Sequence, residues 1–145
     1  MCVWLCTSGS TGQPKAAVHV HAAPQLTDYC YGAHVLGLTE NDVVYSVSKL
    51  FFAYGLSNAM SFPLLAGATT VLTAERPTPN SVAELLRTYG VTVFFAVPTF
   101  YAAFLAANTE PLEGVFGLVV QRPPGPFGDF GVCELDQDFL DRGCV

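Results

Sequence analysis

The chain has 145 residues, of which 51% are hydrophobic and only 12% are charged, and its formal net charge is −6. This length suffices for one domain with a core, and the acidic balance argues against a nucleic-acid partner, which usually requires a basic patch. Because about a quarter of the residues in a typical soluble domain are charged, we expect another part of the protein, a partner or a membrane to cover much of this surface.

The cysteines are five in number and form no C-x-x-C pair. They are Cys2, Cys6, Cys30, Cys133 and Cys144. An odd count without paired spacing argues against a disulfide framework and against a zinc site, so a reducing, cytoplasmic compartment fits best. Cys6 stands in an apolar run, which favours a buried small side chain over a reactive thiol. The first residues lack the basic and long apolar regions of a secretory signal peptide.

Short apolar runs alternate with stretches of helical periodicity along the first part of the chain. The runs predict strands at residues 2–6, 16–20, 42–46, 68–72 and 91–95. The periodic stretches predict helices at residues 24–38, 56–65, 81–89 and 98–107, with Gly37, Gly67 and Gly90 ending the first three. Asn80 or Ser81 is the expected N-cap of the third helix. This alternation predicts an α/β fold: a partial, mainly parallel sheet with flanking helices.

The longest apolar stretch covers residues 91–107. Pro98 interrupts it, and it is shorter than the ~20 residues that a membrane-spanning helix needs. We therefore predict a buried strand followed by a helix, and no membrane span.

The strand and helix pattern breaks after Pro111. Residues 121–128 are rich in proline and glycine, which disfavours regular structure, and the last residues are acidic. We divide the chain into residues 1–110, a partial domain, and residues 111–145, an irregular, acidic tail. The abrupt change suggests a truncated or frame-shifted version of a longer gene.

Residues 7–15, with the sequence TSGSTGQPK, combine backbone freedom, hydroxyl donors and one positive charge. Such a set suits a polyphosphate. The residues concerned are Thr7, Ser8, Gly9, Ser10, Thr11, Gly12 and Lys15. The segment matches neither the Walker loop nor the dinucleotide fingerprint. A flexible serine- and glycine-rich surface turn is the alternative interpretation of the composition alone.

The order of these nine residues closely resembles the phosphate loop of the adenylate-forming (AMP-binding) superfamily. The resemblance implies that the loop binds the β- and γ-phosphates of ATP and that Lys15 is a catalytic residue, acting as an electrostatic stabiliser. One residue departs from the family pattern, because Ala16 stands where glycine is usual. Residues 3–107 share the resemblance, whereas the tail at residues 111–145 does not match the family. The segment with His19 and His21 lies in the matching part, and we interpret both as structural histidines and not as a metal pair.

Residues 49–56, with the sequence KLFFAYGL, resemble the next family motif in the form typical of benzoate–CoA ligases. The resemblance implies that Phe52, Ala53, Tyr54 and Gly55 line the pocket for the carboxylic acid. Flat aromatic walls suit an aryl acid, and a glycine leaves room for a ring. An ordinary aromatic core cluster is the alternative.

The resemblance implies a fragment of the N-terminal AMP-binding domain, at residues 1–110, of an ATP-dependent ligase that joins a benzoate-like acid to coenzyme A. Its cofactors would be ATP, Mg²⁺ and coenzyme A, and the other parts of the ligase would cover its apolar surface. The family's magnesium-binding T-E element, ribose-binding aspartate, hinge and C-terminal lysine do not occur in this sequence, so we expect no activity from the chain alone. A non-catalytic nucleotide-binding fragment and a non-functional product are the alternatives.

Overall fold

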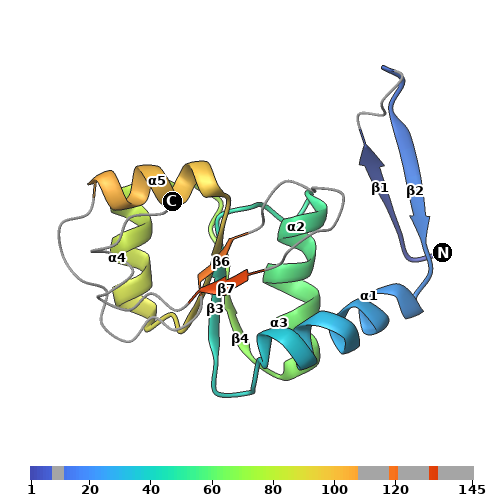
Figure 1. The fold of residues 1–145 in the computed structure, drawn as a ribbon, viewed down its shortest axis with the longest axis horizontal. Coiled ribbons are helices and arrows are strands. Elements are labelled where there is room, and N and C mark those ends of the chain that lie inside the picture. Colours follow the sequence, from blue (N-terminus) through green and yellow to red (C-terminus); the bar gives the residue numbers. More distant parts are fainter. Residues whose placement is uncertain (8–11, 108–117, 121–130, 134–145) are drawn as a thin grey trace.

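The computed structural model describes residues 1–7, 12–107, 118–120 and 131–133. These residues form two sheets, a two-stranded hairpin and a five-stranded sheet. Figure 1 shows the five-stranded sheet between two layers of helices and the hairpin at one end of the molecule. The predicted α/β fold with a mainly parallel sheet is therefore confirmed.

The five-stranded sheet has the strand order β4-β3-β5-β6-β7. Its strands are β3 (Val43–Ser46), β4 (Thr69–Val71), β5 (Val93–Ala96), β6 (Leu118–Val120) and β7 (Gly131–Cys133). Strands β3 to β6 run parallel to one another, and β7 is antiparallel to β6. The chain leaves β3 toward β4 and then crosses back to β5, so the strand order reverses between β3 and β5. In open α/β sheets, ligands bind at the carboxyl ends of the strands at such a reversal.

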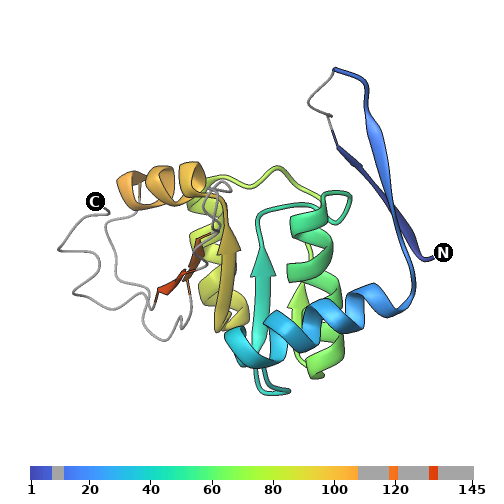
Figure 2. The same cartoon turned by 45° about the vertical axis from the view of Figure 1, so that its right-hand side comes forward.

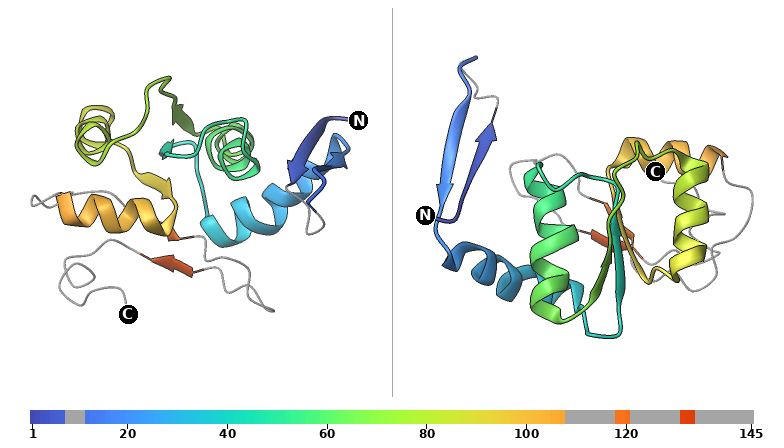
Figure 3. Two further views of the ribbon diagram at one scale, coloured as in Figure 1. Left: turned by 90° about the horizontal axis from the view of Figure 1, so that it is seen from above. Right: turned by 180° about the vertical axis from the view of Figure 1, so that it is seen from behind.

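Helices cover both faces of this sheet, as the two views of Figure 3 show. One face carries α1 (Ala22–Thr27), the π-helical η1 (Asp28–Leu36), α2 (Ala53–Leu56), the π-helical η2 (Ser57–Ser61) and α3 (Phe62–Ala66). The other carries α4 (Pro79–Tyr89) and α5 (Pro98–Ala107). Gly37, Gly67 and Gly90 end their helices with φ angles of 64°, 74° and 58°. Because only glycine adopts this conformation at little cost, all three predicted helix ends are confirmed.

Helix α4 begins earlier than its sequence suggests. Its N-cap is Thr78, whose hydroxyl accepts a hydrogen bond from the Ser81 backbone N–H at 3.2 Å, while the Ser81 hydroxyl accepts one from the Thr78 N–H at 3.0 Å. Pro79 occupies the first helical position, where its missing N–H costs nothing. The prediction of Asn80 or Ser81 as the cap was wrong, because this proline belongs to the helix and not to the preceding turn.

The core lies on both faces of the central strands. Phe94 is fully buried on the face covered by α4 and α5, where its ring centroid lies 5.4 Å from that of Tyr101 and 5.8 Å from that of Phe104. The next residue, Phe95, is fully buried on the opposite face together with Val44. This alternation is what a strand buried on both faces requires, and it anchors the end of β5 that borders the candidate site.

The hairpin consists of β1 (Val3–Thr7) and β2 (Lys15–His19), which pair antiparallel in a sheet of their own. Figure 2 shows it standing apart from the larger sheet. Trp4 is 58% exposed, Val18 is 57% exposed, and Cys6 is also exposed. The prediction of a buried Cys6 was wrong, because no layer of described residues packs over this strand.

Strands β6 and β7 lie in the segment that we predicted to be irregular. β6 continues the parallel sheet next to β5, with Phe94 paired to Leu118, so residues 111–145 are not irregular throughout. The boundary at residue 110 stays a prediction, and most of this tail lies outside the described residues. No helix in the described ranges is long and apolar enough to cross a membrane.

Candidate functional site

The predicted phosphate loop lies at the tip of the hairpin. The backbones of Thr7 and Lys15 pair with each other, so the two ends of the loop are held together. Gly12 has a φ of 82°, and no atom lies near the position of its missing Cβ. The positive φ of the loop backbone, and not a close contact, therefore explains the glycine at position 12. Ser8, Gly9, Ser10 and Thr11 lie outside the described residues, and Lys15 is exposed at the start of β2.

The predicted acid-binding residues form the candidate acid segment, residues 52–55, at the start of α2. Phe52 is the N-cap of α2 and is 57% exposed, Ala53 is exposed, and Tyr54 is half-buried. The segment follows the carboxyl end of β3, which is at Ser46, after the loop of residues 47–51. It therefore lies at the reversal of strand order, where the α/β fold is expected to bind a ligand.

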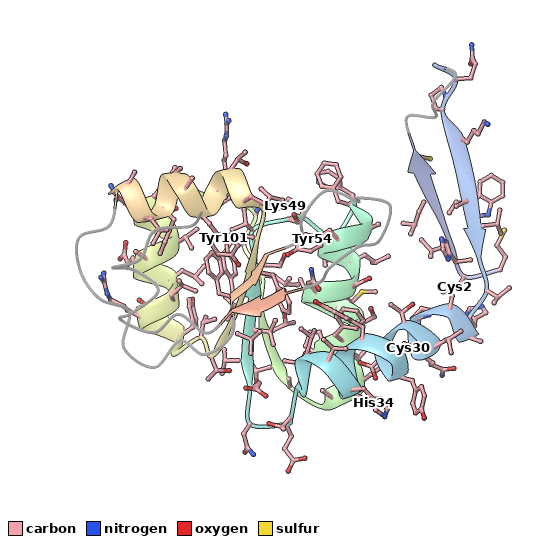
Figure 4. The ribbon with its side chains drawn as sticks, in the orientation of Figure 1. Cys2, Cys30, His34, Lys49, Tyr54 and Tyr101 are labelled. Carbon is pink, nitrogen blue, oxygen red and sulfur yellow. The ribbon has the colours of Figure 1, made fainter. Side chains whose placement is uncertain are left out.

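Two tyrosines hold the carboxyl end of β5 from opposite faces of the sheet. The Tyr54 hydroxyl donates to the Ala96 carbonyl oxygen at 3.3 Å. The Tyr101 hydroxyl donates to the Phe94 carbonyl oxygen at 3.0 Å and accepts from the Ala96 N–H at 3.0 Å. Figure 4 shows both side chains reaching the same end of the sheet, Tyr54 from α2 and Tyr101 from α5. The hydrogen bond to Ala96 thus fixes the Tyr54 side chain relative to the carboxyl end of β5.

Both hydroxyls are neutral over the physiological pH range. Burial raises the pKa of Tyr54 well above its ordinary value, and the neighbouring Tyr31 adds to the shift. Burial also raises the pKa of Tyr101; Tyr54 adds to this rise, and the hydrogen bond with the Ala96 backbone opposes it. These groups can therefore donate hydrogen bonds, but neither is suited to act as a general base at neutral pH.

Gly55 is needed by the protein's own backbone. A Cβ at this position would overlap the carbonyl oxygens of Lys49 and Ser48. We expected this glycine to leave room for the ring of a ligand, but the structure fills the space with the loop that follows β3. The glycine brings α2 close to that loop and so sets the position of Tyr54.

The structure does not bring the predicted phosphate loop and the candidate acid segment together. Lys15 lies in strand β2 of the hairpin. Tyr54 instead lies against the larger sheet, as Figure 4 shows. A mainly apolar cavity of about 570 Å³ lies between the hairpin and the helices, with Leu5 and His19 on one side and Met60 and Leu64 on the other. Within the described ranges, no group of three or more histidine, cysteine, aspartate or glutamate side chains could hold a metal ion.

Three further residues shape this end of the sheet, and none of them is among the predicted site residues. Tyr101 contacts the end of β5. Ser46 is buried, and its hydroxyl donates to the Ser48 carbonyl oxygen at 3.3 Å. The Lys49 ammonium donates to the carbonyl oxygens of Thr73 and Glu75, both at 2.7 Å. A lysine inside an otherwise apolar motif was the available signal for Lys49, but its partners lie 24 and 26 residues away.

Comparison with known proteins assigns the class. The family model described as "AMP-binding enzyme" matches residues 1–122. The chain belongs to this family of AMP-binding enzymes.

Its relatives include ligases that act on aromatic acids. The chain is 53% identical over 113 residues to benzoate–CoA ligase from Thauera aromatica, covering 78% of this chain and 21% of that relative. It is 52% identical over 120 residues to 4-hydroxybenzoate–CoA/benzoate–CoA ligase from Rhodopseudomonas palustris, covering 81% and 22%. The chain therefore spans about a fifth of the length of these curated relatives.

Solved structures agree on the fold. A benzoate CoA ligase from Burkholderia xenovorans LB400 superposes with a TM-score of 0.69 at 45% identity, over 77% of this chain and 22% of that one. The anthranilate CoA ligase AuaEII in complex with anthranoyl-AMP gives a TM-score of 0.75 at 32% identity, over 82% and 24%. The fold is thus that of one part of a longer α/β adenylate-forming domain.

Proposed function

We propose that this chain forms the phosphate-binding and acid-binding part of an ATP-dependent ligase that joins a benzoate-like aryl acid to coenzyme A. The position of residues 52–55 at the reversal between β3 and β5 carries the proposal, because this is where an α/β sheet binds its ligand. The identity of more than 50% to two ligases whose names include benzoate supports an aryl acid.

The reaction would have two steps. The acid's carboxylate oxygen attacks the α-phosphorus of ATP, and the bond to the bridging oxygen breaks to release pyrophosphate. The thiol sulfur of coenzyme A then attacks the carbonyl carbon of the acyl-adenylate, AMP leaves, and the thiol proton is released. The protein accelerates the first step mainly by positioning the reactants and by stabilising charge.

Residues of this chain contribute to the first step. The loop from Thr7 to Lys15 would donate backbone and hydroxyl hydrogens to the β- and γ-phosphates, and Lys15 would stabilise the charge on the departing pyrophosphate. Phe52, Ala53 and Tyr54 would contact the apolar body of the acid. Mg²⁺ would accompany the phosphates of ATP, and the described residues offer no cluster of carboxylates to hold it.

The remaining parts of the ligase would cover the hairpin. Trp4 and Val18 are more than half exposed although both are apolar, and exposed apolar patches commonly mark contact surfaces. The exposed, free Cys2, Cys6 and Cys30 fit a reducing, cytoplasmic compartment. Because the chain spans only about a fifth of the length of the curated relatives it matches, we propose that the chain alone does not catalyse acid-dependent exchange between ATP and pyrophosphate.

Binding experiments with two variants of the full chain test the proposal. Lys15→Ala should weaken ATP binding by about 2 kcal/mol, roughly thirtyfold, and AMP binding much less, because only ATP carries the phosphates that Lys15 contacts. Tyr54→Ala should alter the preference among benzoate and its ring-substituted analogues without changing ATP affinity. Calorimetric titration with ATP, AMP and the acids measures both, and near-ultraviolet circular dichroism checks that each variant is folded.

Three results would contradict parts of the proposal. An equal loss of ATP and AMP affinity in Lys15→Ala would refute the phosphate-loop assignment. ATP binding without any aryl acid binding would favour the non-catalytic nucleotide-binding alternative. Robust exchange between ATP and pyrophosphate by the purified chain would refute its inactivity alone.

A further inference from the structure

Lys49 links the loops that follow two neighbouring strands. It lies in the loop after β3, and its ammonium donates to the carbonyl oxygens of Thr73 and Glu75 at 2.7 Å, with the Thr73 hydroxyl at 3.5 Å. Thr73 and Glu75 lie between β4 and α4. In the part of the chain that the structure describes, no carboxylate pairs with this half-buried lysine. Its three N–H donors thus act as a bridge between main-chain segments.

The Lys49 backbone takes part in the same arrangement. Its carbonyl oxygen accepts a hydrogen bond from the Phe52 N–H at 3.1 Å, which closes the turn that carries the exposed Phe51 and Phe52. The same carbonyl oxygen lies where Gly55 would carry a Cβ. Lys49 therefore touches the candidate acid segment through its backbone and the β4–α4 loop through its side chain.

We propose that Lys49 is a positioning residue for the acid-binding segment, residues 52–55; this inference rests on the acid-binding role proposed above. Its ammonium bridge fixes the turn at residues 49–52 relative to the sheet and so sets the orientation of the aromatic wall formed by Phe52 and Tyr54. Packing alone does little to hold Phe52, because its side chain is 57% exposed. A small displacement of a substrate-positioning group has a large effect on binding and rate.

Lys49→Met tests this role, because methionine keeps most of the apolar stem and removes the three donors. Arg76→Met is the matched control: it removes an exposed cation from the loop that Lys49 binds, next to Glu75. Two measurements on the full chain apply to each variant. One is the hydrogen-exchange rate of the Phe52 amide, which reports the turn directly. The other is the affinity for benzoate compared with that for AMP, measured by NMR titration.

In Lys49→Met, we expect the Phe52 amide to exchange about tenfold faster and benzoate to bind about tenfold more weakly, with AMP affinity within about twofold of wild type. Arg76→Met should match wild type in the Phe52 exchange rate and in both affinities. Lys49→Arg should restore much of the protection at Phe52, because the guanidinium can also donate to two carbonyl oxygens.

Other outcomes would overturn the inference. Unchanged exchange at Phe52 would show that the bridge does not position the turn. An equal loss of benzoate and AMP affinity, with a lower unfolding temperature, would show a general structural role. If the wild-type chain binds no benzoate, the proposed acid-binding function fails, and the exchange rate of Phe52 in Lys49→Met alone decides whether Lys49 positions this segment.

Discussion

The two sheets of this chain differ in the solvent exposure of their apolar side chains. β5 and β1 are both short apolar runs, yet Phe94 and Phe95 in β5 are fully buried, whereas Trp4 in β1 is 58% exposed. β5 has helices on both of its faces, and β1 has a single partner strand. An isolated two-stranded hairpin is marginally stable in water. An apolar strand therefore indicates that other elements must pack over its side chains. Only the structure shows whether the described residues supply those elements.

Truncation of one aromatic residue in each sheet is the strongest way to test this difference. Phe94→Ala should lower the free energy of unfolding by about 3–5 kcal/mol, because it leaves a cavity among Tyr45, Tyr101 and Phe104. Trp4→Ala should change it by less than about 0.5 kcal/mol, as for exposed positions generally. Urea unfolding followed by circular dichroism measures both. Comparable losses would mean that the hairpin is part of the same cooperative core.

The helix cap at Thr78 gives a smaller effect that should be confined to the larger sheet. Thr78→Ala removes the acceptor for the Ser81 N–H and should cost about 1 kcal/mol. Amides of β5 and α4 should then exchange faster with solvent, and amides of the hairpin should not change. Hydrogen exchange followed by NMR measures this, with Thr69→Ala, an exposed threonine at the start of β4, as the control. Faster hydrogen exchange of the β2 amides as well would show that the hairpin and the larger sheet unfold as one cooperative unit.

Much of the larger sheet could be predicted from the sequence, because local chemistry determines it. Gly37, Gly67 and Gly90 marked helix ends since each position requires a positive φ. The apolar stretch with Pro98 was correctly assigned to a strand and a helix. The cap at Thr78 was missed because Pro79 suits both a turn and the first position of a helix.

The candidate site was less predictable, because its contacts join distant residues. The motif at residues 52–55 was identified by resemblance, but the Tyr54 hydroxyl bonds to Ala96, 42 residues away. The Lys49 bridge spans 24 residues or more. Periodicity and composition report on neighbours within a few turns and not on such pairs. The exposure of Cys6 was missed for a related reason, because burial depends on which elements cover a strand.

The smallest expected effect is the pH dependence contributed by Asp42, at the amino-terminal edge of β3. Partial burial acts to raise the pKa of this carboxyl, but hydrogen bonds from the Thr39 backbone at 2.8 Å, the Thr92 hydroxyl at 2.8 Å and the Thr39 hydroxyl at 3.0 Å outweigh it, so the pKa is lowered. A lowered pKa means that ionised Asp42 stabilises the fold above the unfolded value of about 3.9, and that this contribution is lost as the pH falls through the folded value.

The comparison of wild type with Asp42→Asn isolates this contribution. The difference in unfolding free energy should be constant above about pH 5 and should shrink as the pH falls below about 4. It should stay near or below ~1 kcal/mol, because the carboxyl is partly exposed and solvent screens it. Burial raises the pKa of Asp28, so its contribution has the opposite sign, but it is common to both proteins and cancels. Urea midpoints measured from pH 6 to pH 3 test the prediction. If the urea midpoints of the two proteins ran parallel over this pH range, Thr39 and Thr92 would bind protonated Asp42 as well as the ionised carboxylate. The larger sheet would then lack this source of acid sensitivity.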